Sequence, residues 1–275
     1  SRQSPCALVF GDASEYSTAS FIPMPMRTRY QIQAARRLAL AAAVLLRGRA
    51  RMAAWTLHEI LRLGPTLLRN SDLNGPVAHR FRTSGNEVWL TIDDGPDPEQ
   101  TPMLLDLLAA ADARASFFVI GRQVDWNRPL CRRIVGAGHT LENHSYSHAS
   151  GLFWAMPCCA IRDEIVRCSH SIRVAAGVDP AWFRSPAGLT NTCVHPVAAR
   201  SWLRVAGWSA TGLDGLPGAD PASVVARIMR GVQSGAILLM HEGPGRRSVE
   251  TLRLLLEALS ARGFRCVIPS GADVE

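Results

Sequence analysis

The chain has 275 residues, of which 47% are hydrophobic and 19% are charged, so it is long enough to bury a large core. Its net charge of +7 is concentrated in residues 1–82, which hold 12 Arg and 4 acidic residues, whereas residues 83–275 hold 18 Arg and 19 acidic residues. We expect no nucleic-acid partner, because the larger part of the chain is close to neutral. The 7 Cys form no C-x-x-C pair and have no regular spacing, which argues against a disulfide framework.

Residues 1–82 are expected to form an N-terminal extension, partly disordered and then helical. Residues 1–26 contain Pro, Ser and Gly without periodicity. From about residue 31 to 68 the pattern predicts an amphipathic helix that breaks near Gly64-Pro65 and packs on the domain. Its apolar run, residues 38–46, is too short to span a bilayer, which needs about 20 apolar residues, so contact with a membrane surface is the alternative to packing. Arg residues precede this run as in a signal or anchor segment, which favours the bacterial cell envelope over the cytoplasm.

Residues 83–275 have the pattern of one α/β domain, in which short apolar runs alternate with helical periodicity. Helical stretches such as 222–232 and 248–261 separate the runs. Strands joined by such crossovers run parallel. The strand candidates are residues 88–92, 115–120, 140–143, 181–184, 205–209, 236–240 and 264–268.

Polar residues follow these strands at the points where the strands end. Six of them do so: Asp93 and Asp94 after the first strand, His144 after the third, Arg184 after the fourth, Asp214 a few residues past the fifth and His241 after the sixth. In a parallel barrel, reactive groups gather at the carboxyl ends of the strands. Because a single rim would collect all six, the sequence predicts a (β/α) barrel of about seven parallel strands rather than an open doubly wound sheet.

Three of these polar positions have the pattern of a hydrolytic metal site. His144 and His148 are four residues apart, which lets both imidazoles reach one ion if the segment turns helically. Together with Asp94 they give two imidazoles and one carboxylate, a set that leaves coordination positions for water and substrate. Taken singly, an Asp pair is typical of a turn or cap and a His pair of ordinary surface or core positions. The combination favours the metal site.

Residues 88–267 resemble the NodB-homology polysaccharide deacetylases, carbohydrate esterase family four, which have a distorted barrel of this kind. Five motifs of that family occur in order: T-F-D-D-G-P at Thr91 to Pro96 with Ile92 for Phe, H-[ST]-x-x-H at His144 to His148, R-x-P-Y at Arg184 to Pro186 with Ala187 for Tyr, a loose Asp/Trp motif at Trp208 and Asp214 with Gly215 for Trp, and L-x-H at Leu239 to His241.

The resemblance implies roles for the residues of the first motifs. Asp94, His144 and His148 would hold a divalent metal, expected to be Zn²⁺. Asp93 would act as general base on a water molecule. Arg184 would pair with Asp93 and keep that carboxylate ionised and oriented.

The resemblance also implies roles for the later motifs. His241 would protonate the departing amine, and Asp214 would stabilise its charged form. The backbone N–H of Ala187 would help to stabilise the oxyanion, which an Ala can do as well as the family's Tyr. Trp208 and Leu239 would line an apolar pocket for the acetyl methyl group.

The expected function is therefore hydrolysis of N-acetyl groups from a carbohydrate polymer or oligomer, by a hydrolase of linear amide C–N bonds. The expected partner is an acetylated glycan, and the chain is expected to be a monomer. Two alternatives remain: an O-acetyl esterase or other amidohydrolase with the same metal site, and a catalytically inactive glycan-binding homologue. The presence of both Asp93 and His241 argues against the inactive homologue, because a binding module needs neither a base nor an acid.

Overall fold

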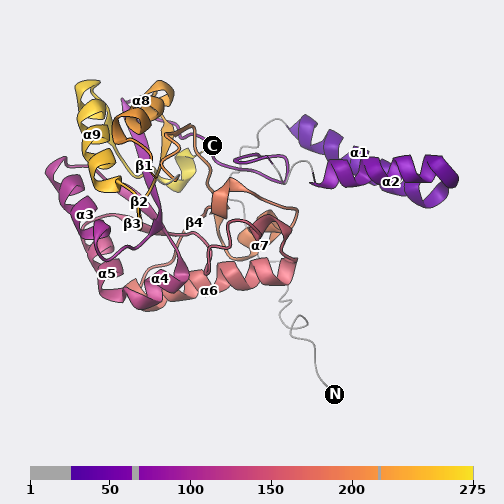
Figure 1. Cartoon of the computed structure of the whole chain (residues 1–275), viewed down its shortest axis with the longest axis horizontal. Helices are drawn as coiled ribbons and strands as arrows, with labels where there is room; N and C mark the ends of the chain where they lie inside the picture. The colour runs from indigo at the N-terminus through magenta and orange to yellow at the C-terminus, as the bar shows by residue number, and fades with distance from the viewer. Residues whose placement is uncertain (1–25, 64–67, 216–217, 275) are drawn as a thin grey trace, which may run out of the picture.

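A computed structural model describes residues 26–63, 68–215 and 218–274 of the chain. Helices α1 (Met26–Leu45) and α2 (Gly48–Leu63) lie against each other and extend away from the sheet rather than packing on it as expected (Figure 1). The helical stretch breaks at residues 46–47. The expected break at Gly64-Pro65 and the expected disorder near the N-terminus lie outside the described residues. Among those described, no helix has the length and hydropathy needed to cross a bilayer.

All strands of the domain belong to one parallel sheet, as the sequence predicts. Their order is β5-β4-β3-β2-β1-β7-β6, and β8 pairs with the start of β1 on the edge opposite β7. The bounds are β1 (Glu87–Gly95), β2 (Ala115–Val119), β3 (Thr140–Asn143), β4 (Trp182–Phe183), β5 (Arg204–Val205), β6 (Ala210–Thr211), β7 (Ala236–His241) and β8 (Arg265–Cys266).

The single strand expected at residues 205–209 is instead two short strands, β5 and β6, at opposite ends of the strand order. Residues 206–209 connect them: the N–H of Ala206 donates to Phe183 of β4, and that of Ser209 donates to Ile237 of β7. The connection is short, so the curled sheet closes on itself through a loop instead of a strand ladder. This makes the barrel distorted, as the family resemblance implies.

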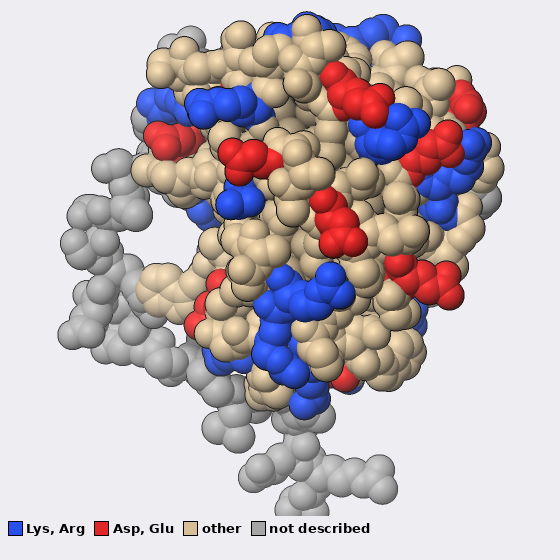
Figure 2. Space-filling view, turned by 90° about the vertical axis from the view of Figure 1, so that its left-hand side faces the viewer, with Lys and Arg blue, Asp and Glu red and all other residues tan. Residues whose placement is uncertain are grey.

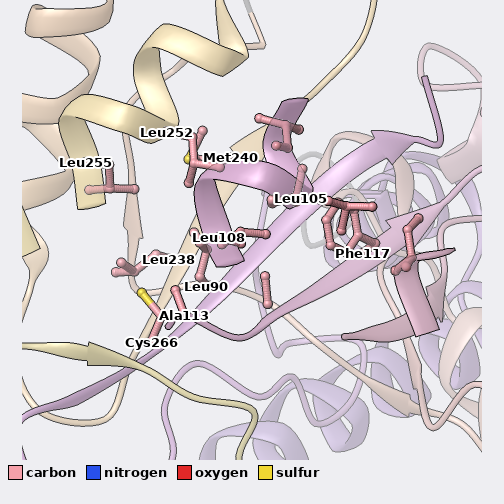
Figure 3. Packing of buried hydrophobic residues seen from close by; sticks show 14 of the residues in the cluster. Leu90, Leu105, Leu108, Ala113, Phe117, Leu238, Met240, Leu252, Leu255 and Cys266 are labelled. Carbon is pink, nitrogen blue, oxygen red and sulfur yellow. The ribbon is translucent and has the colours of Figure 1, made fainter. Parts of the chain in front are cut away.

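Helices cover the outside of the barrel, and the main core lies between them and the strands. In β1, the side chains of Val88, Leu90 and Ile92 face this core, where they meet residues such as Leu252 and Leu255 of α9 (Figure 3). The intervening Trp89 faces the barrel interior with Phe118, Trp182 and Ile237. The helices are α3 (Gln100–Ala110), α4 (Gly121–Trp126), α5 (Arg128–Gly136), α6 (Cys158–Ala176), α7 (Val194–Arg200), α8 (Pro221–Gly231) and α9 (Ser248–Ala261).

Charged side chains of both signs are interspersed over much of the helical face at the left of Figure 1 (Figure 2). Along α9, Arg247 pairs with Glu250 and Arg253 pairs with Glu257. A mixed surface of this kind agrees with the near-neutral charge of residues 83–275.

The segment just before residue 83 is hydrogen-bonded to the sheet and to a residue next to it. The N–H of Ala78 donates to Val205 of β5, and the N–H of Phe81 donates to Gly235, next to β7. Phe81 also forms an isolated bridge with Val274. We therefore propose that the domain begins near residue 68 rather than at residue 83.

One disulfide joins Cys158 to Cys193, whose Cα atoms are 5.1 Å apart. It connects the first residue of α6 to the residue that precedes α7. The expectation that no disulfide framework exists missed this single bond, because two Cys separated by 35 residues show no regular spacing in the sequence. Cys131, Cys159, Cys168 and Cys266 are free thiols.

Candidate active site

The carboxyl end of β1 carries two adjacent buried carboxylates. Asp93 is 2% exposed and Asp94 is 6% exposed. Asp94 has a left-handed backbone conformation, with φ of 76°, which is uncommon for a residue other than Gly and is often found at functional sites. The two side chains have different partners, so the sequence's separation of their roles has a structural counterpart.

Asp93 is paired with the fully buried Arg184. The Nη1 of Arg184 donates to Asp93 Oδ1 at 2.6 Å and to Thr91 Oγ1 at 2.8 Å, and its Nη2 donates to the carbonyl of Gly207 at 2.7 Å. Burial lowers the pKa of Arg184, but the negative charge of Asp93 opposes this shift. A buried charge is tolerated when it is paired and hydrogen-bonded. The guanidinium therefore fixes one oxygen of Asp93 and leaves Oδ2 toward His144, whose Nε2 is 3.7 Å away.

Asp94, His144 and His148 converge, with one donor atom from each within 4.8 Å of the others. The Oδ1 of Asp94 is 3.0 Å from His148 Nε2 and 3.4 Å from His144 Nε2. On its other side, His144 places Nδ1 2.8 Å from the carbonyl oxygen of Arg184. Because a carbonyl only accepts, Nδ1 must carry the proton, and the lone pair of Nε2 then faces Asp94.

These three residues fit a divalent cation. Oδ1 of Asp94 is buried without a hydrogen-bond partner, which is uncommon in folded proteins and is expected of an atom that binds an ion. Burial, with the neighbouring His144, lowers the pKa of His148 to about 4, so this imidazole is neutral at pH 7. Burial opposes ionisation of Asp94, but its interactions with the nearby imidazoles of His144 and His148 hold its pKa well below the usual range. Neutral imidazole and ionised carboxylate are the forms that bind metals.

The two histidines meet through an irregular turn, not through the helical turn that the sequence suggested. Ser145 and His148 both have positive φ, at 67° and 54°. Glu164 of α6 stabilises this turn. Its carboxylate accepts hydrogen bonds from the backbone N–H of Ser147 at 2.8 Å and from the hydroxyl of Ser147 at 2.9 Å. Glu164 was not predicted, since nothing in its local pattern distinguishes it from other helical acids.

His241, at the end of β7, lies beside Asp93, to which it is paired in the β1–β7 register. Its Nδ1 is 3.0 Å from Asp214 Oδ1, and its backbone N–H donates to Asp214 Oδ2 at 2.7 Å. Burial lowers the pKa of His241, but the hydrogen bond and charge of Asp214 outweigh this and raise it above the usual value. The sequence placed Asp214 here on its weakest motif, and the structure shows the contact. At Gly215 an added Cβ would lie 3.5 Å from the His241 ring.

The remaining predicted site residues lie on segments that continue from Arg184, precede Asp214 or precede His241. Ala187 lies three residues after Arg184 in a turn where it has φ of 55°. The next residue, Gly188, is packed so closely on Trp208 that an added Cβ would lie 2.4 Å from the indole ring. Side chains alternate along β7, so Leu239 points away from the core side, which Leu238 and Met240 face. It shares the other side of the strand with Ile237, which packs with Trp208.

Arg246 is a further residue at the site that sequence reasoning missed. Its Nη2 lies 2.9 Å from Asp94 Oδ2, the carboxylate oxygen that the histidines do not face. It also lines a small cleft together with Asp214 and His241. Gln100 of α3 holds the loop that carries it, since its amide donates to the carbonyl of Gly243 at 2.8 Å. No motif marks Arg246, because its role arises only from the path of this loop.

Comparisons with known proteins identify the family. The model of the polysaccharide deacetylases matches residues 81–206. The chain is 35% identical over 192 residues to a chitooligosaccharide deacetylase of Bradyrhizobium sp. (strain ANU 289), an alignment that covers 64% of this chain and 86% of the relative. The chain belongs to the polysaccharide deacetylase family. This is the NodB-homology group of carbohydrate esterase family four, whose named members here are hydrolases of amide bonds.

Two further matches show the range of this family. A peptidoglycan-N-acetylglucosamine deacetylase of Bacillus cereus is 32% identical over 208 residues, covering 74% of this chain and 96% of the relative. A solved structure of a family four pseudoenzyme from Bacillus anthracis is 28% identical with a TM-score of 0.62, covering 68% of this chain and 65% of that chain. These relatives thus differ in the glycan that their names give, and they include a pseudoenzyme.

Proposed function

We propose that this polysaccharide deacetylase removes N-acetyl groups from an acetylated glycan by metal-dependent hydrolysis. The observation that carries the proposal is the convergence of a ligand set, Asp94, His144 and His148, beside a base candidate and an acid candidate that are neighbours across two strands, Asp93 and His241. A glycan-binding protein needs the ligand set at most, whereas hydrolysis of an amide needs all three components.

The ligand set would hold one divalent cation, which we propose to be Zn²⁺ because two imidazoles and one carboxylate are typical of catalytic zinc. When bound, the ion would polarise the acetyl carbonyl and make a nearby water molecule more acidic. Arg246, on the second oxygen of Asp94, would keep that carboxylate oriented so that Oδ1 remains the ligand atom.

Asp93 would take the proton of the attacking water through Oδ2. Its Oδ1 is already engaged by Arg184, which leaves Oδ2 to accept the proton. As the water oxygen bonds to the carbonyl carbon, negative charge develops on the carbonyl oxygen. The N–H of Ala187 would donate to that oxygen, and Trp208 and Leu239 would enclose the methyl group of the acetyl.

His241 would deliver the proton that the leaving amine requires. Its Nδ1 faces Asp214, so Nε2 is the nitrogen left to donate, and the raised pKa of His241 keeps the ring protonated further into neutral pH. The C–N bond breaks as the nitrogen accepts this proton, which gives acetate and a free amine on the sugar. Asp93 would thus act as the general base and His241 as the general acid.

The alternatives keep parts of this site. An O-acetyl esterase would use the same ligand set and base but would release an alcohol, which depends less on the acid. An inactive homologue would only bind the glycan; a solved structure similar to this chain is that of a pseudoenzyme. We also propose that the protein acts in the cell envelope, because a disulfide such as Cys158–Cys193 persists in oxidising compartments and is uncommon in the cytosol.

The test is to incubate the zinc-loaded protein with acetylated chitooligosaccharides, peptidoglycan fragments and O-acetylated xylan, and to measure both acetate and new primary amine. We expect acetate and amine in equal amounts from at least one N-acetylated glycan. Acetate without new amine would indicate the esterase. No acetate from any substrate would contradict the proposed function.

A further inference from the structure

Asn70 contacts two loops of the candidate site, although it lies outside the residues that match the family model. Its backbone N–H donates to the carbonyl of Gly188 at 2.7 Å. Its side-chain amide donates to the carbonyl of Trp208 at 2.8 Å, and its side-chain oxygen accepts the N–H of Trp208 at 3.1 Å. A single residue therefore joins the turn that carries Ala187 to the backbone of Trp208.

The three chain segments meet at very short range. A Cβ at Gly188 would lie 2.4 Å from the ring of Trp208 and 3.1 Å from the backbone nitrogen of Asn70, and a Cβ at Gly207 would lie 2.1 Å from Asn70 Oδ1. These glycines let the turn, the indole and the amide approach each other without intervening side chains. The bonds of Asn70 thus tie the backbone of Trp208 to the turn on which its indole packs.

The side-chain amide suits this position for two reasons. It supplies one donor and one acceptor to a single residue's backbone, as a neighbouring strand would. Asp lacks the donor, and Ala lacks both. In addition, Asn70 has φ of 54°, a conformation that Asn tolerates better than most residues with a side chain.

We propose that Asn70 is a positioning residue that holds Trp208, the proposed wall of the acetyl pocket, against the Ala187-Gly188 turn, and so selects acetyl over longer acyl groups. The inference rests on the proposed function and makes it more specific. Without the two amide bonds, the backbone of Trp208 keeps the longer contact of its carbonyl with His79 Nδ1, at 3.4 Å, and the bonds of Gly207 and Ser209 on either side. Its link to the turn that carries Ala187 is lost. A pocket that distinguishes one methylene typically does so by about 10-fold to 200-fold, and this preference should decrease when the wall is loosened.

The variant that tests the inference is Asn70→Gly. Glycine keeps the positive φ and the backbone bond to Gly188 and removes only the side-chain bonds. The measurement is kcat/KM of the zinc-loaded enzyme for the N-acetyl and N-propionyl forms of one glucosamine oligomer. We expect kcat/KM for the N-acetyl substrate to fall by about 10-fold, and the ratio of the N-acetyl to the N-propionyl kcat/KM to fall by at least about 3-fold. Zinc affinity should not change, because none of the proposed zinc ligands contacts Asn70.

Asn74→Ala is the matched control, because this amide lies in the same segment but donates to the carbonyl and hydroxyl of Thr190. Asn74→Ala should leave the acetyl-to-propionyl ratio unchanged. If the substitution only reduces the amount of folded protein, it lowers the rates for both substrates by the same factor. Hydrogen exchange at the Trp208 N–H gives a readout without catalysis: it should accelerate in Asn70→Gly and stay unchanged in Asn74→Ala. An unchanged ratio in an active Asn70→Gly enzyme, or unchanged exchange in any case, would overturn the inference. A wild-type protein that deacetylates nothing contradicts the proposed function, and with it the acetyl pocket.

Discussion

The two halves of the site differ in how their polar atoms are satisfied. On the ligand side, Asp94 Oδ1 is buried without a hydrogen bond and faces two imidazole nitrogens. On the proton-transfer side, Asp93 is bonded to Arg184 and His241 is bonded to Asp214. An atom that binds an ion is thus left without a protein donor, at a cost in stability, whereas each group that transfers a proton is held by a charged partner.

Removing a ligand should have the largest effect. In His148→Ala we expect most of the metal to be lost and acetate release to fall by about 1000-fold, because the ion stabilises the developing charge by several kcal/mol. His170→Ala is the control, since His170 is exposed on α6 and should keep both properties. Metal analysis beside the acetate assay decides the matter, and full metal occupancy in His148→Ala would show that the ligand set is wrong.

The next largest effect should come from the proton-transfer side and should spare the metal. Asp93→Asn removes the base, so turnover should fall by roughly 100-fold or more, while Asp94, His144 and His148 still bind the ion. Stopped assays for acetate with metal analysis of the same sample measure both quantities. Turnover within a few-fold of wild type would mean that Asp93 is not the base.

Arg246 tests whether the ligand side also depends on a charged partner. Arg246→Gln should weaken metal affinity by about 10-fold, the lower end of the usual effect of residues that orient a ligand. Competition with a chelator measures this affinity without reference to activity. Arg253→Gln changes an exposed Arg that pairs with Glu257 and should have no effect. Equal metal affinities in the two variants would show that Arg246 does not contribute to metal binding.

The smallest expected effect concerns the pH dependence of the rate. Because turnover needs both a base and a protonated acid, the profile should be bell-shaped, with the fall at high pH due to loss of the proton of His241. Asp214 raises the pKa of His241, so Asp214→Asn should move the alkaline limb to lower pH and leave the acidic limb nearly in place. An alkaline limb that does not move in this variant would contradict the assignment of Asp214.

Much of the fold and the centre of the site follow from the sequence. Continuous apolar runs such as residues 88–92 mark buried strands by composition alone, and the motif residues lie next to the strand ends, where backbone geometry places them. The split of residues 205–209 into β5 and β6 did not follow, because it depends on which strands are neighbours across the barrel. Asn70, Glu164 and Arg246 did not follow either, since each reaches the site from a distant segment and has no local pattern.

The most direct test of the two-sided site compares Asp93→Asn with Asp94→Asn, two substitutions at adjacent buried carboxylates. Metal content after dialysis against zinc and acetate release are measured on both proteins. We predict that both variants lose activity, that Asp94→Asn also loses the metal, and that Asp93→Asn retains it. Loss of metal from Asp93→Asn with retention in Asp94→Asn, or equal loss from both, would contradict the division of the site into a ligand side and a proton-transfer side.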